Sequence, residues 1–398
     1  MSTALETPGN HTLVNLSFYG NNSLENSCPN LEENFAVRVG VITLYVFMFL
    51  TSILGNCLIL VTVYRTQRMR TAVNLFIANM AISDIIQPVF GVPRVVVEVL
   101  YGRETWLIGG AAGAVLCKLA YFAQDVSLSV SIFSIVGITT ERFYAVMQPL
   151  KISFLKSHVQ MLLPLTWVIA VIMHGVYFDV FRIRRDHVTQ MIVCYQHWAS
   201  PHSALIYYSV FLAGLFLWAL LAIAIMYSII IVKLRRSRGS GHAWVVRKSR
   251  EVQERKILQV ALVITIVFFA CFMPQVILVI VAPLDVWPHC SIEVLRFVTK
   301  VMEHSYTAFN PLICLIFSQN YREGFIRVFL SSCGFCTYPL EDDTGSPPGV
   351  GKAVKRSSDG GHVALTPLTL RESLRLGMTA PSMSSPALMR AEGVVMNK

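Results

Sequence analysis

The sequence predicts an all-α membrane protein: a bundle of seven transmembrane helices with a short amphipathic eighth helix. Of the 398 residues, 54% are hydrophobic and 14% are charged, whereas about a quarter of the residues in a soluble protein are charged. Seven apolar runs each reach the roughly 20 residues that a helix needs to cross a bilayer core. Strands of a membrane barrel are shorter and alternate polar with apolar side chains, so these runs do not predict a barrel.

The chain order of the apolar runs defines the expected organisation of the protein. The predicted transmembrane helices cover residues 35–63, 72–100, 111–146, 158–180, 202–232, 257–281 and 292–317. We expect a glycosylated extracellular tail over residues 1–34, the bundle over 35–317, an amphipathic helix with palmitoylation sites over 318–336, and a cytoplasmic tail over 337–398. That last segment is rich in Ser, Thr, Pro and Gly, a composition typical of disorder.

The distribution of basic residues predicts the orientation in the membrane. Lys and Arg gather in the segments after the first, third and fifth runs, and the positive-inside rule makes that side cytoplasmic. The N-terminus is then extracellular, and we expect a plasma-membrane location. The net charge of +10 therefore gives no indication of nucleic-acid binding. One basic group, Arg182, Arg184 and Arg185, lies on the outer side against this bias.

The predicted outer segments carry sites for modification. Asn-x-Ser/Thr sequons occur at Asn10, Asn15 and Asn21, in agreement with an extracellular tail. Among the nine cysteines, Cys117 at the start of the third run and Cys194 in the following outer loop are predicted to form a disulfide.

The other cysteines divide by their position relative to the membrane. Cys28 and Cys290 are also extracellular, and the sequence leaves open whether they are bridged or free. Cys57, Cys271 and Cys314 lie inside apolar runs and are expected to be small buried packing residues. Cys333 and Cys336 follow the amphipathic segment and are candidate palmitoylation sites.

Four polar residues interrupt the apolar runs at similar depth: Asn56, Asp84, Ser131 and Asn310. An ionised carboxylate inside a membrane must pair, become protonated or bind a cation. Asp84, Ser131 and Asn310 are therefore a candidate sodium site. A neutral Asp84 in a hydrogen-bonded network is the alternative that the sequence leaves open.

A charged triplet begins at Glu141 and contains Arg142, where the third run meets a basic loop. Glu254 begins the sixth helix on the same side, so Arg142 has two candidate partners, and breaking the second pair would make a two-state switch. A solvated charged surface is the alternative. Pro274 and Pro311 remove helical hydrogen bonds and are expected to kink the sixth and seventh helices.

Polar residues near the outer ends of the predicted helices indicate a water-filled cavity, because several of them would be costly facing lipid. Their mixed charge suits a zwitterionic or peptide ligand better than a lipid. The candidate ligand-binding residues are Glu98, Gln124, Asp125, Phe272, Gln275, Lys300, Glu303 and His304.

In order and spacing, these features resemble a rhodopsin-like G-protein-coupled receptor. The resemblance covers about residues 35–336. It rests on Gly55-Asn56, Ala81-Ile82-Ser83-Asp84, Trp106, Cys117, Glu141-Arg142-Phe143 with Pro149, Trp167, Tyr227, Phe268, Cys271-Phe272-Met273-Pro274 and Asn310-Pro311-Leu312-Ile313-Cys314.

Three positions depart from the pattern of that family. Ala219 replaces a proline in the fifth helix, so the bulge usual there is not expected. Phe272 replaces a tryptophan, and Cys314 replaces a tyrosine whose hydroxyl joins a water network with the residue matching Tyr227. The loss of that hydroxyl predicts an altered balance between resting and active states.

The resemblance implies a function and a set of partners. Gln124, Trp106 and the segment Asn74-Leu75-Phe76-Ile77 are similar to neuropeptide receptors of the neuropeptide FF, galanin and orexin kind. They imply an extracellular peptide ligand, outward movement of the sixth helix about Pro274, and coupling to a heterotrimeric G protein. Phosphorylation by receptor kinases, arrestin binding and an allosteric sodium ion are further implications.

Several alternatives remain open at this point. In one alternative, the ligand is a small molecule. In others, the receptor is constitutively active or sequesters its ligand. A transporter or channel is the alternative from another class, although the ionisable residues gather at the two ends with only Asp84 between them. No nucleophile triad, metal-ligand cluster or phosphate loop predicts an enzyme.

Overall fold

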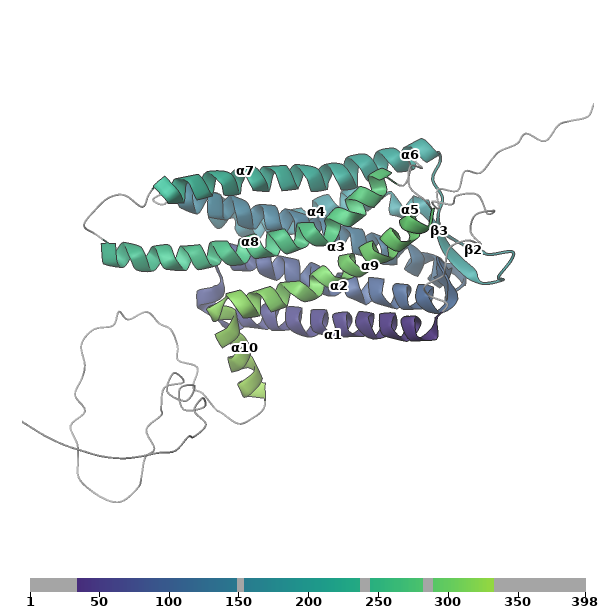
Figure 1. Cartoon of the computed structure of the whole chain (residues 1–398), viewed down its shortest axis with the longest axis horizontal. Coiled ribbons are helices and arrows are strands. Elements are labelled where there is room, and N and C mark those ends of the chain that lie inside the picture. Colours follow the sequence, from purple (N-terminus) through teal and green to yellow (C-terminus); the bar gives the residue numbers. More distant parts are fainter. Residues whose placement is uncertain (1–33, 149–153, 237–243, 282–288, 333–398) are drawn as a thin grey trace, which may run out of the picture. The chain divides into compact units, whose positions relative to one another are not determined.

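The computed structural model describes residues 34–148, 154–236, 244–281 and 289–332. Long helices lie side by side in this part of the chain and form a bundle (Figure 1). They are α1 (Phe35–Arg65), α2 (Ala72–Tyr101), α3 (Gly110–Met147), α4 (Phe154–His174), α7 (Gly214–Arg236), α8 (Trp244–Val281) and α9 (His289–Phe317). Shorter helices are η3 (Gln67–Met69), α5 (Tyr177–Val180), α6 (Pro201–Ile206), η4 (Tyr207–Ala213) and α10 (Gln319–Ser332).

The surface of the bundle is apolar, as a lipid-facing surface must be. On α1, for example, Phe47, Leu50 and Leu54 are exposed, whereas Ser52 and Asn56 on the opposite side are fully buried. By length and composition, six helices among the described residues are able to cross a membrane. The protein is therefore a multi-pass membrane protein whose polar side chains point inward.

The seventh long helix, α9, has a different composition but the same place in the bundle. It packs against α1, α2 and α8 over its 29 residues. Arg296, Lys300 and Glu303 interrupt its apolar sequence, and all three line the cavity described below. These charges make α9 less apolar than the other long helices, but they face the cavity and not the lipid-facing surface.

The fifth membrane crossing contains a bulge that the sequence did not predict. It consists of α6, the π-helical segment η4 and α7, and the Gly214 N–H bonds to the Ser209 carbonyl across the wider π turn. Ala219, fully buried, lies six residues beyond the end of η4. The expectation that a missing proline removes the bulge was therefore wrong: a π-bulge forms here without proline.

A small sheet lies at the outer end of α3. Its strands β1 (Thr105–Trp106), β3 (Ile192–Gln196) and β2 (Phe181–Arg185) are antiparallel in that order. A disulfide joins Cys117 of α3 to Cys194 in the middle of β3, as predicted.

The outer basic group lies on β2, outside the bundle. Arg182, Arg184 and Arg185 are exposed, and the Arg184 guanidinium carbon lies 4.8 Å from the centre of the Tyr195 ring on β3. These three cations therefore lie on a strand that packs against the end of α3, with their side chains exposed.

Two cysteine predictions differ in outcome. Cys271 and Cys314 are buried, whereas Cys57 is exposed on α1. The prediction that Cys57 is a buried packing residue was wrong, because an apolar run has a lipid-facing side as well as an inward-facing one. The glycosylation sites, Cys28, the palmitoylation sites and the side chains of Cys290 and Glu254 lie outside the described residues.

Candidate ligand pocket and signalling core

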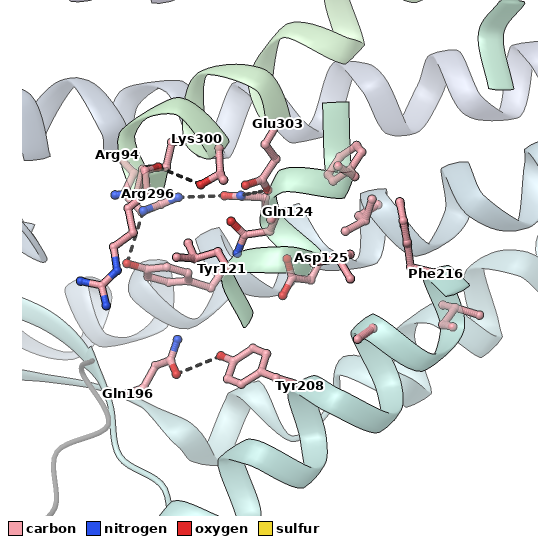
Figure 2. A pocket seen from close by; sticks show the side chains of 18 of the residues that line it. Arg94, Tyr121, Gln124, Asp125, Gln196, Tyr208, Phe216, Arg296, Lys300 and Glu303 are labelled. Carbon is pink, nitrogen blue, oxygen red and sulfur yellow. Dashed lines mark hydrogen bonds between the residues drawn. The ribbon is translucent and has the colours of Figure 1, made fainter. Parts of the chain in front are cut away.

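A cavity of about 300 Å³ opens between the outer halves of α2, α3, α7, α8 and α9 (Figure 2). Seven of the eight predicted ligand-binding residues line it: Glu98, Gln124, Asp125, Phe272, Gln275, Lys300 and Glu303. They come from four different helices, so only the folded bundle brings them together. At the mouth, burial raises the pKa of the Glu104 carboxyl, an effect that the neighbouring Arg103 opposes.

The chemistry of the lining changes with depth. Arg103, Glu104 and Arg296 lie at the outer end. Glu98 and Lys300 follow further in, and Gln124, Asp125 and Glu303 lie deeper again. The floor is apolar and is formed by Leu128, Ile132, Phe216 and Phe272.

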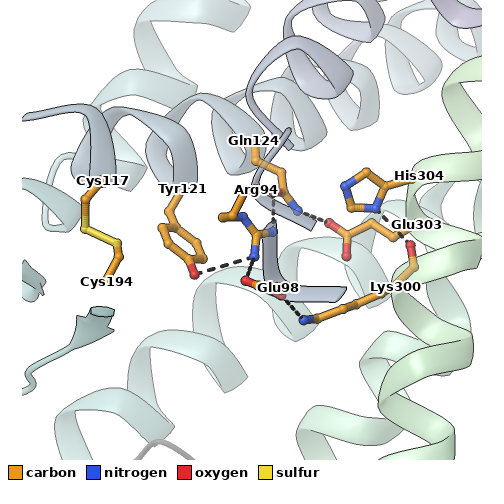
Figure 3. A network of polar contacts seen from close by, with 9 residues as sticks. All are labelled: Arg94, Glu98, Cys117, Tyr121, Gln124, Cys194, Lys300, Glu303 and His304. Atoms are coloured by element: carbon orange, nitrogen blue, oxygen red, sulfur yellow. Dashed lines mark hydrogen bonds and ion pairs between the residues drawn. A yellow bond between two sulfur atoms is a disulfide. The ribbon is translucent and has the colours of Figure 1, made fainter. Parts of the chain in front are cut away.

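Glu98 is held by two cations (Figure 3). Its Oε1 accepts a hydrogen bond from Arg94 Nη1 at 2.6 Å, and its Oε2 accepts one from Lys300 Nζ at 2.6 Å. The Glu98 and Arg94 side chains are each only 7% exposed, and that of Lys300 is 39% exposed. The Lys300 pair ties α2 to α9, and the two cations together neutralise the Glu98 carboxylate within the protein.

Arg94 is the charged residue in this network that the sequence analysis did not identify. Its guanidinium carbon lies 4.5 Å from the centre of the Tyr121 ring, a cation–π distance. Its Nη2 also donates to Gln124 Oε1 at 3.0 Å. A signal was present in the sequence: Arg94 stands four residues before Glu98, the spacing of an ion pair along one helix.

Gln124 links this ion network to Glu303. Because Arg94 donates to the amide oxygen, the amide nitrogen of Gln124 faces α9, where Nε2 donates to Glu303 Oε1 at 2.6 Å. A neutral amide orients Glu303 without cancelling its charge.

Asp125 has a different partner from its neighbour Gln124. Its Oδ2 accepts a hydrogen bond from the hydroxyl of Tyr177, a residue of α5 that is 1% exposed. Nearby, buried His174 bonds Ser129 on α3 through Nε2 at 2.8 Å and the Tyr207 hydroxyl through Nδ1 at 2.7 Å. These polar contacts join α3 and α4 to the π segment η4.

His304 does not line the cavity, in contrast to its prediction as a ligand-binding residue. It is 2% exposed, its Nδ1 donates to the Lys300 carbonyl at 2.9 Å, and its ring meets the Tyr45 ring edge-on. A Cβ at Gly91 would lie 2.8 Å from His304 Nε2. The ring therefore occupies space that α2 leaves open by having glycine there.

The buried polar residues predicted at mid-depth lie together. Asn310 Nδ2 donates to Asp84 Oδ2 at 2.6 Å, and Ser131 Oγ donates to Asp84 Oδ1 at 3.4 Å. The Tyr306 hydroxyl lies 3.2 Å from Ser131 Oγ. Asn56 lies beside them on α1 and donates to the Thr307 carbonyl of α9 at 3.0 Å.

At the end of the bundle opposite the cavity, Arg142 pairs with Glu141. Its Nε donates to Glu141 Oε2 at 2.7 Å, and its Nη2 bonds the same oxygen. Both residues are buried. The first of the two predicted partners of Arg142 is therefore in place.

Cys314 belongs to the same buried cluster as Tyr227 and Tyr321. Cys314 is fully buried, and the buried Tyr227 hydroxyl has no hydrogen-bond partner among the described side chains. Seven residues further on, Tyr321 is 2% exposed, and its hydroxyl donates to Asn74 Oδ1 at the start of α2, at 3.3 Å.

The altered balance between resting and active states that the resemblance implies is tested with Cys314→Tyr. We expect this variant to change ligand-independent signalling, because a second hydroxyl would enter the core that contains Tyr227. The measurement is second-messenger production in cells with matched surface amounts of both proteins. Cys314→Phe is the control, since it adds the ring without the hydroxyl. Equal basal signalling in Cys314→Tyr and the original chain would contradict the expectation.

Among the described residues, seven long helices enclose a cavity at one end of the bundle and a buried Glu141–Arg142 pair at the other. This arrangement agrees with a transmembrane receptor. The chain belongs to the rhodopsin family of seven-transmembrane receptors, whose pattern it matches over residues 55–313. It is 28% identical to the RYamide receptor of Drosophila melanogaster over 330 residues, 80% of this chain and 70% of that one.

Two further relatives are neuropeptide receptors of the kinds that the sequence motifs indicated. The galanin receptor type 1 of Mus musculus is 26% identical over 342 residues, 83% of this chain and 94% of that one. The neuropeptide FF receptor 1 of Rattus norvegicus is 24% identical over 316 residues, 75% of this chain and 72% of that one. The predicted resemblance to this group of receptors is confirmed.

Proposed function

We propose that this protein is a plasma-membrane receptor for an extracellular peptide and activates a heterotrimeric G protein. The cavity carries the proposal: it opens at the end of the bundle that bears the disulfide and the small sheet, and it combines charged sides with an apolar floor. A peptide offers both kinds of group. The names of the relatives, which are receptors for RYamide, galanin and neuropeptide FF, support the same class of ligand.

Contacts below the cavity floor supply a route from ligand to core. The Phe272 ring on α8 lies 4.8 Å from the Phe268 ring and 4.9 Å from the Tyr306 ring, centre to centre. Tyr306 in turn contacts Ser131 beside Asp84. A ligand that moves Phe272 would repack this cluster, and α8 would swing outward about Pro274, favouring a state that already exists in equilibrium.

At the cytoplasmic end, that movement would expose Arg142 to the G protein. Glu141, Tyr227, Asn310 and Pro311 complete the set of residues through which we propose that coupling occurs. Receptor kinases and arrestin would then act on the cytoplasmic Ser and Thr residues. The N-terminus is extracellular and the C-terminus cytoplasmic in this proposal.

The residues around Asp84 fit a sodium ion. One carboxylate oxygen of Asp84 lies near the Ser131 hydroxyl, and oxygen donors of this type suit a small hard cation. Asp84, Ser131 and Asn310 would hold the ion. Its positive charge would offset the buried carboxylate and so favour the resting arrangement of α2, α3 and α9.

The proposal is tested by expressing the full chain in cells and screening amidated neuropeptides with calcium and cyclic-nucleotide readouts. A concentration-dependent response that Arg142→Ala abolishes at equal surface expression is the expected result. A signal that is the same with and without every peptide, yet lost in Arg142→Ala, would favour the constitutively active alternative. Current or uptake in the absence of G-protein signalling would contradict the receptor proposal.

A further inference from the structure

We propose that Glu303 is the residue that reads the charge of the ligand, by binding a guanidinium or ammonium group of the peptide, and that Glu98 is an internal counter-ion. This inference rests on the proposed function, because it assigns a ligand chemistry to the same cavity. It gives different roles to Glu98 and Glu303, which the sequence alone predicts equally as ligand-binding residues.

The first step is the pairing of the cavity carboxylates. Both oxygens of Glu98 accept hydrogen bonds from cations, Arg94 and Lys300, at 2.6 Å each. A ligand cation at Glu98 would have to displace one of them and leave it unpaired, at the cost of a buried uncompensated charge. Glu98 is therefore unsuited to bind a ligand cation.

The second step is the environment of Glu303. It lines the cavity, is partly exposed to it, and makes no direct salt bridge with a residue that the structure describes. Arg94 interacts with it electrostatically, but across the Gln124 amide. Its hydrogen bond comes from the neutral amide of Gln124 at 2.6 Å and occupies Oε1. Because a carboxylate oxygen pair accepts about four hydrogen bonds, most of its capacity remains for a ligand donor.

The third step is orientation. Arg94 donates to Gln124 Oε1 and thereby directs the amide nitrogen of Gln124 toward Glu303. The Arg94 guanidinium is itself engaged by Glu98, Gln124 and the Tyr121 ring. The ion network thus places the Glu303 carboxylate without neutralising it by direct contact (Figure 3).

Asp125 is the competing carboxylate, at a similar depth on α3. Its Oδ2 accepts the hydroxyl of buried Tyr177, so it anchors α5 to α3. We assign Asp125 this structural role and assign ligand charge to Glu303. The apolar floor of Leu128, Ile132, Phe216 and Phe272 lies directly below, so a ligand suited to both places an apolar group next to its cation.

The test uses two small probes on the full-length receptor in lipid nanodiscs: Nα-acetyl-arginine amide and Nα-acetyl-citrulline amide. Citrulline has nearly the shape of arginine but no charge. We expect the original chain to prefer the arginine probe, by saturation-transfer NMR titration. A charge-assisted hydrogen bond contributes enough that Glu303→Gln should reduce this preference by at least about tenfold.

Three variants make the result specific. Glu303→Asp keeps the charge and should keep a preference for arginine, which shows that the helix still folds. Asp179→Asn removes an exposed outer carboxylate and should leave the preference unchanged. An absent preference in the original chain, its survival in Glu303→Gln, or its loss only in Asp125→Asn would overturn the inference.

The failure of this inference is distinguishable from failure of the proposed function. A chain that responds to peptides in cells but shows no arginine preference overturns only the assignment of Glu303. A chain that prefers arginine through Glu303 but answers no peptide retains the cation site and loses the peptide-receptor proposal.

Discussion

Among replacements of a single cavity residue by an uncharged one, Glu98→Gln is expected to destabilise the receptor most. The change leaves Arg94, 7% exposed, without its carboxylate partner, and breaking a buried ion pair in this way costs about 3–5 kcal/mol. The thermal midpoint of the purified receptor in nanodiscs should fall by roughly 10 °C.

The control for this prediction removes the cation as well. In the double variant Arg94→Gln with Glu98→Gln neither position carries an unpaired charge, so the loss should be clearly smaller than the sum of the two single losses. Lys300, 39% exposed, can reach water without Glu98. Additive losses would show that the Arg94–Glu98 pair contributes little.

Removing the disulfide is expected to have the second large effect. In Cys117→Ser, β3 is no longer tied to α3, and loss of a native disulfide typically costs about 2–5 kcal/mol. We expect a lower thermal midpoint and less receptor at the cell surface, measured by labelling of an N-terminal epitope.

Cys57→Ser is the matched control, because Cys57 is an unbridged cysteine exposed on α1. It should leave both quantities nearly unchanged. If Cys117→Ser had the same midpoint and surface amount as Cys57→Ser, the tie between β3 and α3 would not contribute to stability.

The sequence predicted the bundle well because apolar runs of membrane length have few other structures to adopt. The first predicted helix, residues 35–63, is α1 to within two residues at its end. The fourth was less accurate: α4 ends at His174, and Tyr177–Val180 form the separate short helix α5. An apolar sequence continues past the helix end there, so composition alone does not mark the break.

The sequence predicted which residues form the candidate site better than it predicted which of them interact with each other. Seven of its residues line one cavity, because polar groups in membrane helices point inward. The sequence alone did not identify Arg94 as the partner of Glu98. It also did not predict that His304 packs against Gly91 of α2 and not in the cavity. The rotation of each helix and the choice among nearby partners depend on packing between segments that are distant along the chain.

The polar contacts around the cavity are unevenly shared among the helices. Arg94, Gln124, Lys300 and Glu303 cross-link α2, α3 and α9, whereas Gln275 on α8 forms no hydrogen bond with any described residue. The outer ends of the three linked helices should therefore behave as one rigid wall. A bound ligand would then pull the outer end of α8, which lacks these cross-links, toward the cavity. The opposite end of α8 would consequently tilt away from the bundle.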